Sequence, residues 1–210
     1  MKKIILVFIL LLGLITEINA QDTSFGLKAN GSMTNIKSKK LREKKNNFEP
    51  GITVSAFAHI EFSPNLAIQP ELSMSYTEGK IRFGYKRFKY EYSSVEVPIF
   101  VLGQFESNSG KFFFGLGPIV GYGFDSEDAK WKIGNSSGYD YDWPGYWDGY
   151  IRMGLNHWYG GGAGIIGYEL HNGVTFQAEY RGLKDLRSNK RNRSKIDIHT
   201  ISFGIGYRFK

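Results

Sequence analysis

The sequence predicts an all-β fold, an eight-stranded antiparallel up-and-down transmembrane β-barrel, on three observations. Segments in which apolar residues alternate with small or polar ones recur from Ser24 to Phe209. The connections between these segments are alternately long and short, as in barrels with short periplasmic turns and longer extracellular loops. Residues 1–20 have the pattern of a secretory signal peptide. Together these features predict a chain that is exported and inserted into a bacterial outer membrane.

The N-terminal segment has the three parts of a signal peptide. Lys2 and Lys3 precede an apolar core, Ile4–Ile15, and an imperfect cleavage site ends at Ala20. The core is shorter than the roughly 20 residues that a membrane-spanning helix needs, which favours cleavage over anchoring. The chain has no cysteine, which excludes a lipidated N-terminal Cys and any disulfide. The expected division is residues 1–20 for the signal peptide and residues 21–210 for the barrel domain.

Composition agrees with a secreted β protein. Removing residues 1–20 takes two Lys and one Glu from the 27 basic and 20 acidic residues, which leaves 25 and 19 and a net charge of +6. The chain has 26 Gly, 13 Tyr, 16 Phe and only 6 Pro, a balance that favours strands over disorder. No later stretch is apolar over enough residues to form a membrane-spanning helix.

The first four predicted strands lie in the N-terminal half. Ser24–Thr34 and Gly51–Phe62 alternate between apolar or small residues and polar ones. Leu66–Thr77 keeps this alternation, but Pro70 cannot donate to the ladder, so we expect a bulge or a locally missing bond there. The fourth strand, Ser94–Val101, places valine and isoleucine in one lane.

The last four predicted strands begin with the most regular one. In Lys111–Phe124 large apolar residues occupy one lane, and glycines occupy most of the other, which suits a strand with a lipid-facing outer side and a tight inner side. His157–Leu170 is rich in glycine, and Val174–Arg181 and Thr200–Phe209 alternate again.

The seven connections alternate between long and short. An eight-strand barrel with both mature termini in the periplasm requires this order, whereas a soluble sandwich or lipocalin-like barrel has no reason to sort its connections by length. The predicted location is therefore the outer membrane, with both mature termini periplasmic. The long connections are Asn35–Asn47, Gly79–Tyr92, Asp125–Asn156 and Lys184–Lys195, and the short ones are Ser63–Asn65, Glu106–Gly110 and His171–Gly173.

Short motifs in order along the chain also resemble a known family, the PorT-like outer-membrane β-barrel proteins. The resemblance covers nearly the whole mature chain, and it implies the fold and the membrane. Most members have no assigned activity, so it supplies no catalytic residues. The motifs are Gly26–Asn30, Pro50–Gly51, Ile68–Leu72, Val95–Pro98, Gly115–Pro118, Gly162–Gly164, Gly167–Leu170 and Gly206–Phe209.

The lane opposite the lipid-facing one carries charged residues, which would lie in the lumen. An eight-strand barrel is only wide enough for side chains to fill its interior, and charges in that space must pair or form hydrogen bonds. We therefore expect an ion-paired network that fills the lumen rather than a conducting path. Its predicted members are Lys28, His59, Glu61, Glu71, Glu96, Glu179, Arg181 and Arg208.

The favoured function is non-enzymatic, with a structural, binding or assembly role. The alternative is a lipid-modifying outer-membrane enzyme of the lipid A deacylase or acyltransferase type, which would need His157, His171 or His199 beside a Ser and an acid. His171 lies in a predicted periplasmic turn, and no Ser follows either of the other two at a suggestive offset. One observation separates the two functions: the enzyme requires His157 or His199 to lie within hydrogen-bond distance of a Ser and a carboxylate.

The long connection Asp125–Asn156 is where a specific function is expected. Trp143, Tyr146 and Trp147 supply rigid amphipathic contact area, which suits recognition of a protein or glycan partner. The same aromatics could instead form a lid over the barrel mouth or extend the flanking strands. Carboxylates in this connection do not follow an EF-hand pattern, so no metal site and no cofactor are expected.

The expected partners follow from location and charge. The basic loops Lys37–Lys45 and Arg187–Lys195 would contact outer-membrane lipid and the phosphates of lipopolysaccharide. Periplasmic chaperones and the barrel-assembly machinery would act during biogenesis. No nucleic-acid partner is expected, because an exported, membrane-embedded chain does not meet one.

Overall fold

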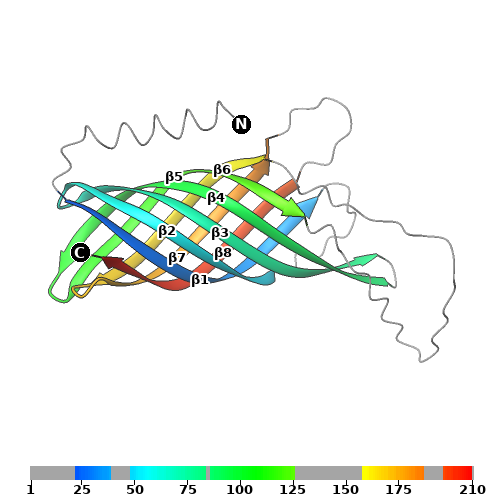
Figure 1. Ribbon diagram of the computed structural model, residues 1–210, viewed down its shortest axis with the longest axis horizontal. Coiled ribbons are helices and arrows are strands. Elements are labelled where there is room, and N and C mark those ends of the chain that lie inside the picture. The colour runs from blue at the N-terminus through cyan, green and yellow to red at the C-terminus, as the bar shows by residue number, and fades with distance from the viewer. Residues whose placement is uncertain (1–21, 39–47, 84–85, 126–157, 187–195, 210) are drawn as a thin grey trace.

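A computed structural model describes residues 22–38, 48–83, 86–125, 158–186 and 196–209. In these residues eight strands form one closed antiparallel barrel, in which each strand pairs with its sequence neighbours and β8 pairs with β1 (Figure 1). The predicted fold class is confirmed. The strands are β1 Asp22–Ser38, β2 Glu49–Ser63, β3 Leu66–Phe83, β4 Lys86–Ser107, β5 Gly110–Asp125, β6 Trp158–Leu170, β7 Val174–Asp185 and β8 Ile196–Phe209. Within the described ranges, no helix is long and apolar enough to cross a membrane.

Most strands are longer than the predicted ones. The largest difference concerns Gly79–Tyr92, which was expected to be a long connection: β3 and β4 pair through it, from Gly79 opposite Tyr90 to Phe83 opposite Lys86. Backbone pairing does not require an apolar residue, so a ladder can continue past the end of the apolar lane. The alternation therefore predicts the part of a strand with a lipid-facing lane, and it misses the part beyond.

Pro70 interrupts the ladder without creating a bulge. The pairing of β2 with β3 is broken between Phe57 opposite Glu71 and Ile60 opposite Ile68, and the register is the same on both sides. The missing pairing near Pro70 thus follows from its missing N–H group. The register shift between β2 and β3 lies instead at Glu61/Ser63, next to the turn.

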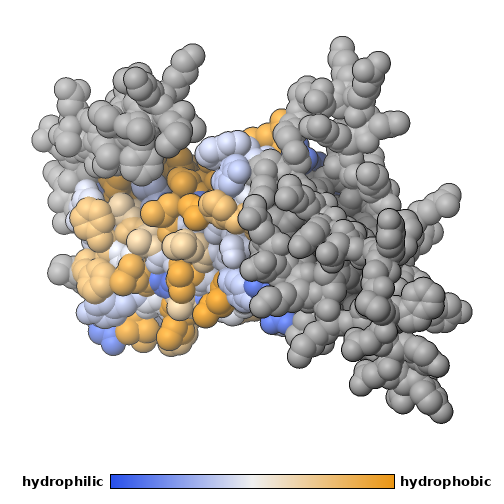
Figure 2. Space-filling view, turned by 45° about the vertical axis from the view of Figure 1, so that its right-hand side comes forward, coloured by the Kyte–Doolittle hydropathy of each residue, from blue (hydrophilic) through white to orange (hydrophobic). Residues whose placement is uncertain are grey.

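The outer face of the barrel is apolar over its middle. Large side chains there are exposed, among them Leu116 (72%), Phe203 (66%) and Phe25 (62%), and Figure 2 shows apolar residues spread over the middle of the barrel wall. A folded chain exposes so much contiguous apolar surface only where that surface meets an apolar environment. This outer face is therefore the lipid-facing surface.

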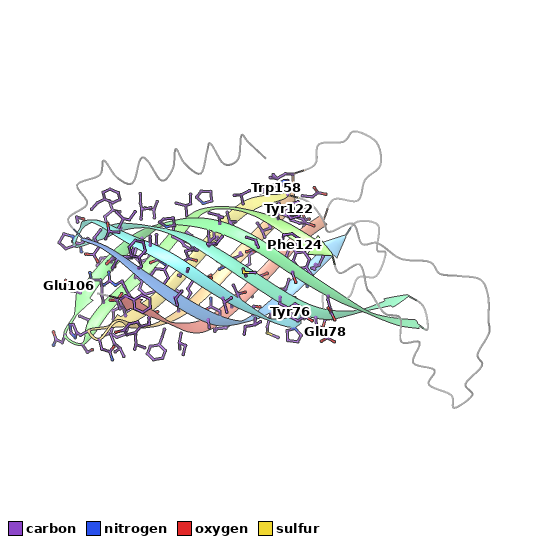
Figure 3. All side chains as sticks on the ribbon, viewed as in Figure 1. Tyr76, Glu78, Glu106, Tyr122, Phe124 and Trp158 are labelled. Atoms are coloured by element: carbon purple, nitrogen blue, oxygen red, sulfur yellow. The ribbon has the colours of Figure 1, made fainter. Side chains whose placement is uncertain are left out.

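Aromatic side chains mark both ends of that apolar face. At the end with the long connections, the Tyr122 and Trp158 rings lie 5.4 Å apart (Figure 3). At the end with the short turns, the Phe112 and Tyr168 rings lie 4.5 Å apart and the Tyr207 and Phe209 rings 5.2 Å apart. Two aromatic girdles flanking an apolar band are typical of barrels that span a bilayer.

The start of β1 and the end of β8 lie at the same end of the barrel as the three short turns (Figure 1). The longer connections leave from the opposite end. The two ends of the barrel therefore differ in the length of their connections, as the sequence predicts, with one exception: only two residues separate β3 from β4, where a long connection was expected.

Candidate functional site: the closed lumen

A cluster of five charged side chains lies at the centre of the lumen. Lys28 Nζ donates to Glu71 Oε1 at 2.6 Å and also pairs with Glu179. Arg181 donates from Nη2 to Glu179 Oε2 at 2.7 Å and from Nη1 to Glu96 Oε2 at 2.9 Å. All five residues are buried. This central ion cluster links β1, β3, β4 and β7 across the inside of the barrel.

A second ion-paired layer lies nearer the short turns. Arg208 Nη2 donates to Glu169 Oε1 at 2.6 Å, and its Nη1 donates to Glu61 Oε1 at 3.0 Å. The Lys111 ammonium lies 3.1 Å from the same Glu61 oxygen. This turn-end ion cluster, formed by Glu61, Lys111, Glu169 and Arg208, ties β2, β5, β6 and β8 together.

Neutral polar side chains connect the two clusters. Gln69 Nε2 donates to Glu71 Oε1 at 2.8 Å, and Gln69 Oε1 lies 3.0 Å from His59 Nδ1. His59 Nε2 in turn lies 3.2 Å from Glu61 Oε1 and 3.0 Å from Gln104 Nε2. Gln69 and His59 therefore join the two ion clusters through hydrogen bonds, which also give these buried polar groups the partners they require.

Apolar side chains fill the remaining lumen. Phe100 is fully buried, and Leu102, Ile119 and Ile165 are nearly so. At the end with the long connections, Tyr92, Tyr159, Leu183 and Ile198 belong to the same buried cluster. A cavity of about 10 Å³ lies among residues of the turn-end side, including His59, Gln104 and Arg208. That volume is about enough for one water molecule, far less than a channel needs.

The structure brings together all eight residues that the sequence assigns to the lumen, as the contacts above describe. The sequence reasoning missed Lys111 and Glu169, which complete the turn-end ion cluster. Both belong to the inward lane, because Lys111 precedes Phe113 by two positions and Glu169 follows Gly167 by two. The alternation of residue types therefore predicts that both side chains face the lumen.

Two further sequence candidates, His199 and His171, lie outside the lumen. The ring of His199 stacks on Tyr180, and its Nδ1 lies 2.7 Å from the exposed Tyr180 hydroxyl. His171 lies in the turn after β6. Within the described ranges, no group of three or more His, Cys, Asp or Glu residues could hold a metal ion. The remaining candidates, His157, Trp143, Tyr146, Trp147, and most of the two basic loops, lie outside the described residues.

Counted with every group ionised, the central ion cluster has one more negative than positive charge, since it has three carboxylates and two cations. Both oxygens of Glu179 accept hydrogen bonds from charged donors, whereas Glu71 Oε2 is buried with no hydrogen-bond partner. We expect Glu71→Gln to lower the free energy of unfolding by at most about 1 kcal/mol, because Lys28 keeps an acceptor and the excess charge is removed.

The matched variant Glu179→Gln should lower the free energy of unfolding by about 1.5–3 kcal/mol, because it weakens the charge-assisted hydrogen bonds from Lys28 and Arg181. Both values can be obtained from denaturant unfolding of the protein in lipid vesicles. Equal losses for the two variants would show that the lack of a hydrogen bond to Glu71 Oε2 and the excess charge have no energetic consequence.

Comparison with known proteins agrees with this architecture. The family model for the outer membrane protein beta-barrel domain matches residues 6–209. Among solved structures, Neisserial surface protein A (NspA) is similar with a TM-score of 0.50, 12% identity, and coverage of 90% of this chain and 99% of that chain. OprG from Pseudomonas aeruginosa gives a TM-score of 0.45 and 12% identity, covering 89% and 96% of the two chains.

Ail of Yersinia pestis, in complex with the heparin analogue sucrose octasulfate, gives a TM-score of 0.45 and 12% identity, covering 90% of this chain and 99% of that chain. None of the curated proteins matches the chain. At 12% identity, the likeness to NspA shows the fold alone. The match of the family model over almost the whole length shows that this chain belongs to the family of the outer membrane protein beta-barrel domain.

Proposed function

We propose that the protein is a non-enzymatic outer-membrane barrel of the PorT-like type, which serves as a closed anchor and presents its long connections for binding or assembly. In this proposal both mature termini lie in the periplasm. The placement of the start of β1 and the end of β8 at the short-turn end supports that orientation, because short turns are periplasmic in such barrels.

The observation that carries the proposal is the filled lumen. Arg181 on β7 reaches Glu96 on β4, so charged pairs cross the interior instead of lining a water-filled path. The buried apolar cluster that includes Phe100 and Ile198 fills other parts of the lumen. A solute would have to break buried ion pairs to pass, and separating such pairs costs several kcal/mol.

The position of His199 supports a role without catalysis. Its Nδ1 is within hydrogen-bond distance of the Tyr180 hydroxyl on the outer face, whereas acyl transfer by a serine needs a His base held by a carboxylate. The lipid-modifying alternative therefore gains no support from this histidine.

Single-channel recording in planar bilayers tests the closed lumen. The full-length protein, folded as judged by heat-modifiable migration on a gel, is expected to give no steady conductance. A porin reconstituted in the same way is the positive control. Steady openings of porin size from the folded protein would overturn the proposal.

Recognition by the long connections is the second part of the proposal. Its supporting observation is in the sequence, where Trp143, Tyr146 and Trp147 provide rigid contact area within one long connection. Replacing all three with Ala should leave the barrel folded and abolish capture of a protein or glycan partner from membranes. Unchanged capture of every wild-type partner would assign these aromatics to a lid or to another structural role.

A further inference from the structure

Two buried oxygen atoms beside the small cavity of the lumen have no hydrogen-bond partner. Gln104 on β4 and Thr175 on β7 both line this cavity, which we call the turn-end cavity. The two residues are only 1% and 4% exposed. Among the protein atoms that the structure describes, nothing bonds to Gln104 Oε1 or to Thr175 Oγ1. Burying a polar atom without a partner is unfavourable, so a ligand in the cavity that reaches both oxygens would stabilise the fold.

The other polar atoms of these two residues are already engaged. Gln104 Nε2 lies 3.0 Å from His59 Nε2, so the nitrogen of this amide has a partner and its oxygen does not. The main chain of Gln104 bonds to Asn65, through its N–H at 2.9 Å and its carbonyl oxygen at 3.0 Å. The main chain of Thr175 pairs with Glu169 on β6 and Gly206 on β8. The two side-chain oxygens therefore remain as the acceptors available to a ligand.

The size of the turn-end cavity limits that ligand to one small molecule. Its volume is about 10 Å³, close to the least that holds a water molecule. A buried water also needs two to four polar partners, and the two oxygens supply the first two. Water has two hydrogens to donate, so it can serve Gln104 Oε1 and Thr175 Oγ1 at the same time.

The charges around the cavity favour a neutral ligand over an ion. Arg208 donates to Glu169 through Nε and Nη2 and to Glu61 through Nη1, and Lys111 donates to the same Glu61 oxygen. Counted with every group ionised, this turn-end ion cluster has two cations and two carboxylates. A cation in the cavity would meet Arg208 and Lys111, which line it, and an anion would meet the oxygen of Gln104. A neutral water avoids both repulsions.

We propose that the turn-end cavity is a binding site for one structural water molecule. The water donates to Gln104 Oε1 and Thr175 Oγ1 and so links β4 to β7 across the lumen. This site goes beyond the proposed function, because it requires neither an orientation of the barrel in the membrane nor a partner at the long connections.

X-ray radiolysis followed by mass spectrometry tests the site in the folded, full-length protein in lipid vesicles. Radiolysis of a bound water forms a hydroxyl radical in place, and the radical oxidises aromatic rings beside it. Phe57 and Phe113 line the turn-end cavity, whereas Phe100 is fully buried and does not line it. Phe57 and Phe113 should therefore be oxidised faster than Phe100.

Substitutions at Thr175 separate the bound water from general access of solvent. Thr175→Val keeps the shape of the side chain but removes the hydroxyl, so oxidation of Phe57 and Phe113 should fall about tenfold, as expected when a buried water loses one hydrogen bond. Thr175→Ser keeps the hydroxyl and should remain within about twofold of wild type. Heat-modifiable migration on a gel checks that each variant is folded.

Thr34→Val is the matched control. Thr34 is buried on β1, its hydroxyl lies 3.1 Å from that of Thr200, and it does not line the turn-end cavity. This variant should leave oxidation of Phe57 and Phe113 within about twofold of wild type, because it removes no partner of the water.

Three results would overturn the inference. Wild-type oxidation of Phe57 and Phe113 no faster than that of Phe100 would mean that the cavity is dry or holds an ion. Oxidation that Thr175→Val leaves unchanged would mean that the radicals do not come from a water held by this hydroxyl. An equal fall in Thr34→Val would mean that the change reports a general loosening of the barrel.

Discussion

Arg181→Ala is expected to destabilise the folded barrel by about 3–5 kcal/mol, the effect of breaking a buried ion pair. The Arg181 guanidinium donates to Glu179 and Glu96, and its Nη2 lies 4.0 Å from Glu71 Oε2. Removing it leaves three buried carboxylates with the single ammonium of Lys28. The free energy of unfolding can be measured with denaturant in lipid vesicles, followed by tryptophan fluorescence.

Lys184→Ala is the matched control for this prediction. Lys184 lies on the same strand, β7, and is exposed on the outer side. Its removal should change the free energy of unfolding by less than about 0.5 kcal/mol, as is usual for surface substitutions. If Arg181→Ala costs no more than Lys184→Ala, the central ion cluster does not stabilise the fold.

Gly117→Ala is expected to lower the free energy of unfolding by about 1–3 kcal/mol, because a methyl group has no space on the inner side of β5. A Cβ atom at Gly117 would overlap the Ile99 carbonyl oxygen and lie 2.7 Å from the Ile99 carbonyl carbon. These are backbone atoms of the neighbouring strand, so they cannot rotate away, and β4 and β5 would have to separate. The same denaturant measurement, with heat-modifiable migration as a check of folding, reports the loss.

Gly162→Ala provides the comparison for Gly117→Ala. Gly162 lies on the adjacent strand β6, and the nearest atom to an added Cβ is the Gly117 carbonyl oxygen at 3.9 Å. This ordinary contact predicts a change within about 0.5 kcal/mol. Equal losses at the two positions would mean that a general effect of replacing glycine in a strand, rather than the close approach of β4 to Gly117, determines the loss of stability.

The alternation of residue types predicted which side chains face the lumen. A strand has a side-chain period of two, so one apolar lane fixes the face of every other residue on that strand. The inward positions of Lys28, Glu96 and Arg181 follow from this rule alone. The same rule applied to the ends of the strands would also have found Lys111 and Glu169.

The pairing partners within the lumen could not be predicted from the alternation. Arg181 meets Glu96, 85 positions away in the sequence, because strand tilt and stagger bring their positions to the same height in the barrel. The alternation specifies which face of a strand a side chain lies on, but not its height along the barrel axis. The outer part of the β3–β4 hairpin was missed for a different reason, since its two strands pair through backbone hydrogen bonds where no apolar lane marks them.

A double-mutant cycle between Arg181 and Glu96 tests most directly whether ion pairs cross and close the lumen. The cycle uses Arg181→Met, Glu96→Gln and the double variant, each unfolded by denaturant in lipid vesicles. Because the two side chains meet at 2.9 Å from opposite strands, we predict a coupling free energy of about 1–3 kcal/mol. Losses that add to within about 0.5 kcal/mol would contradict the account, since residues without a shared interaction behave additively.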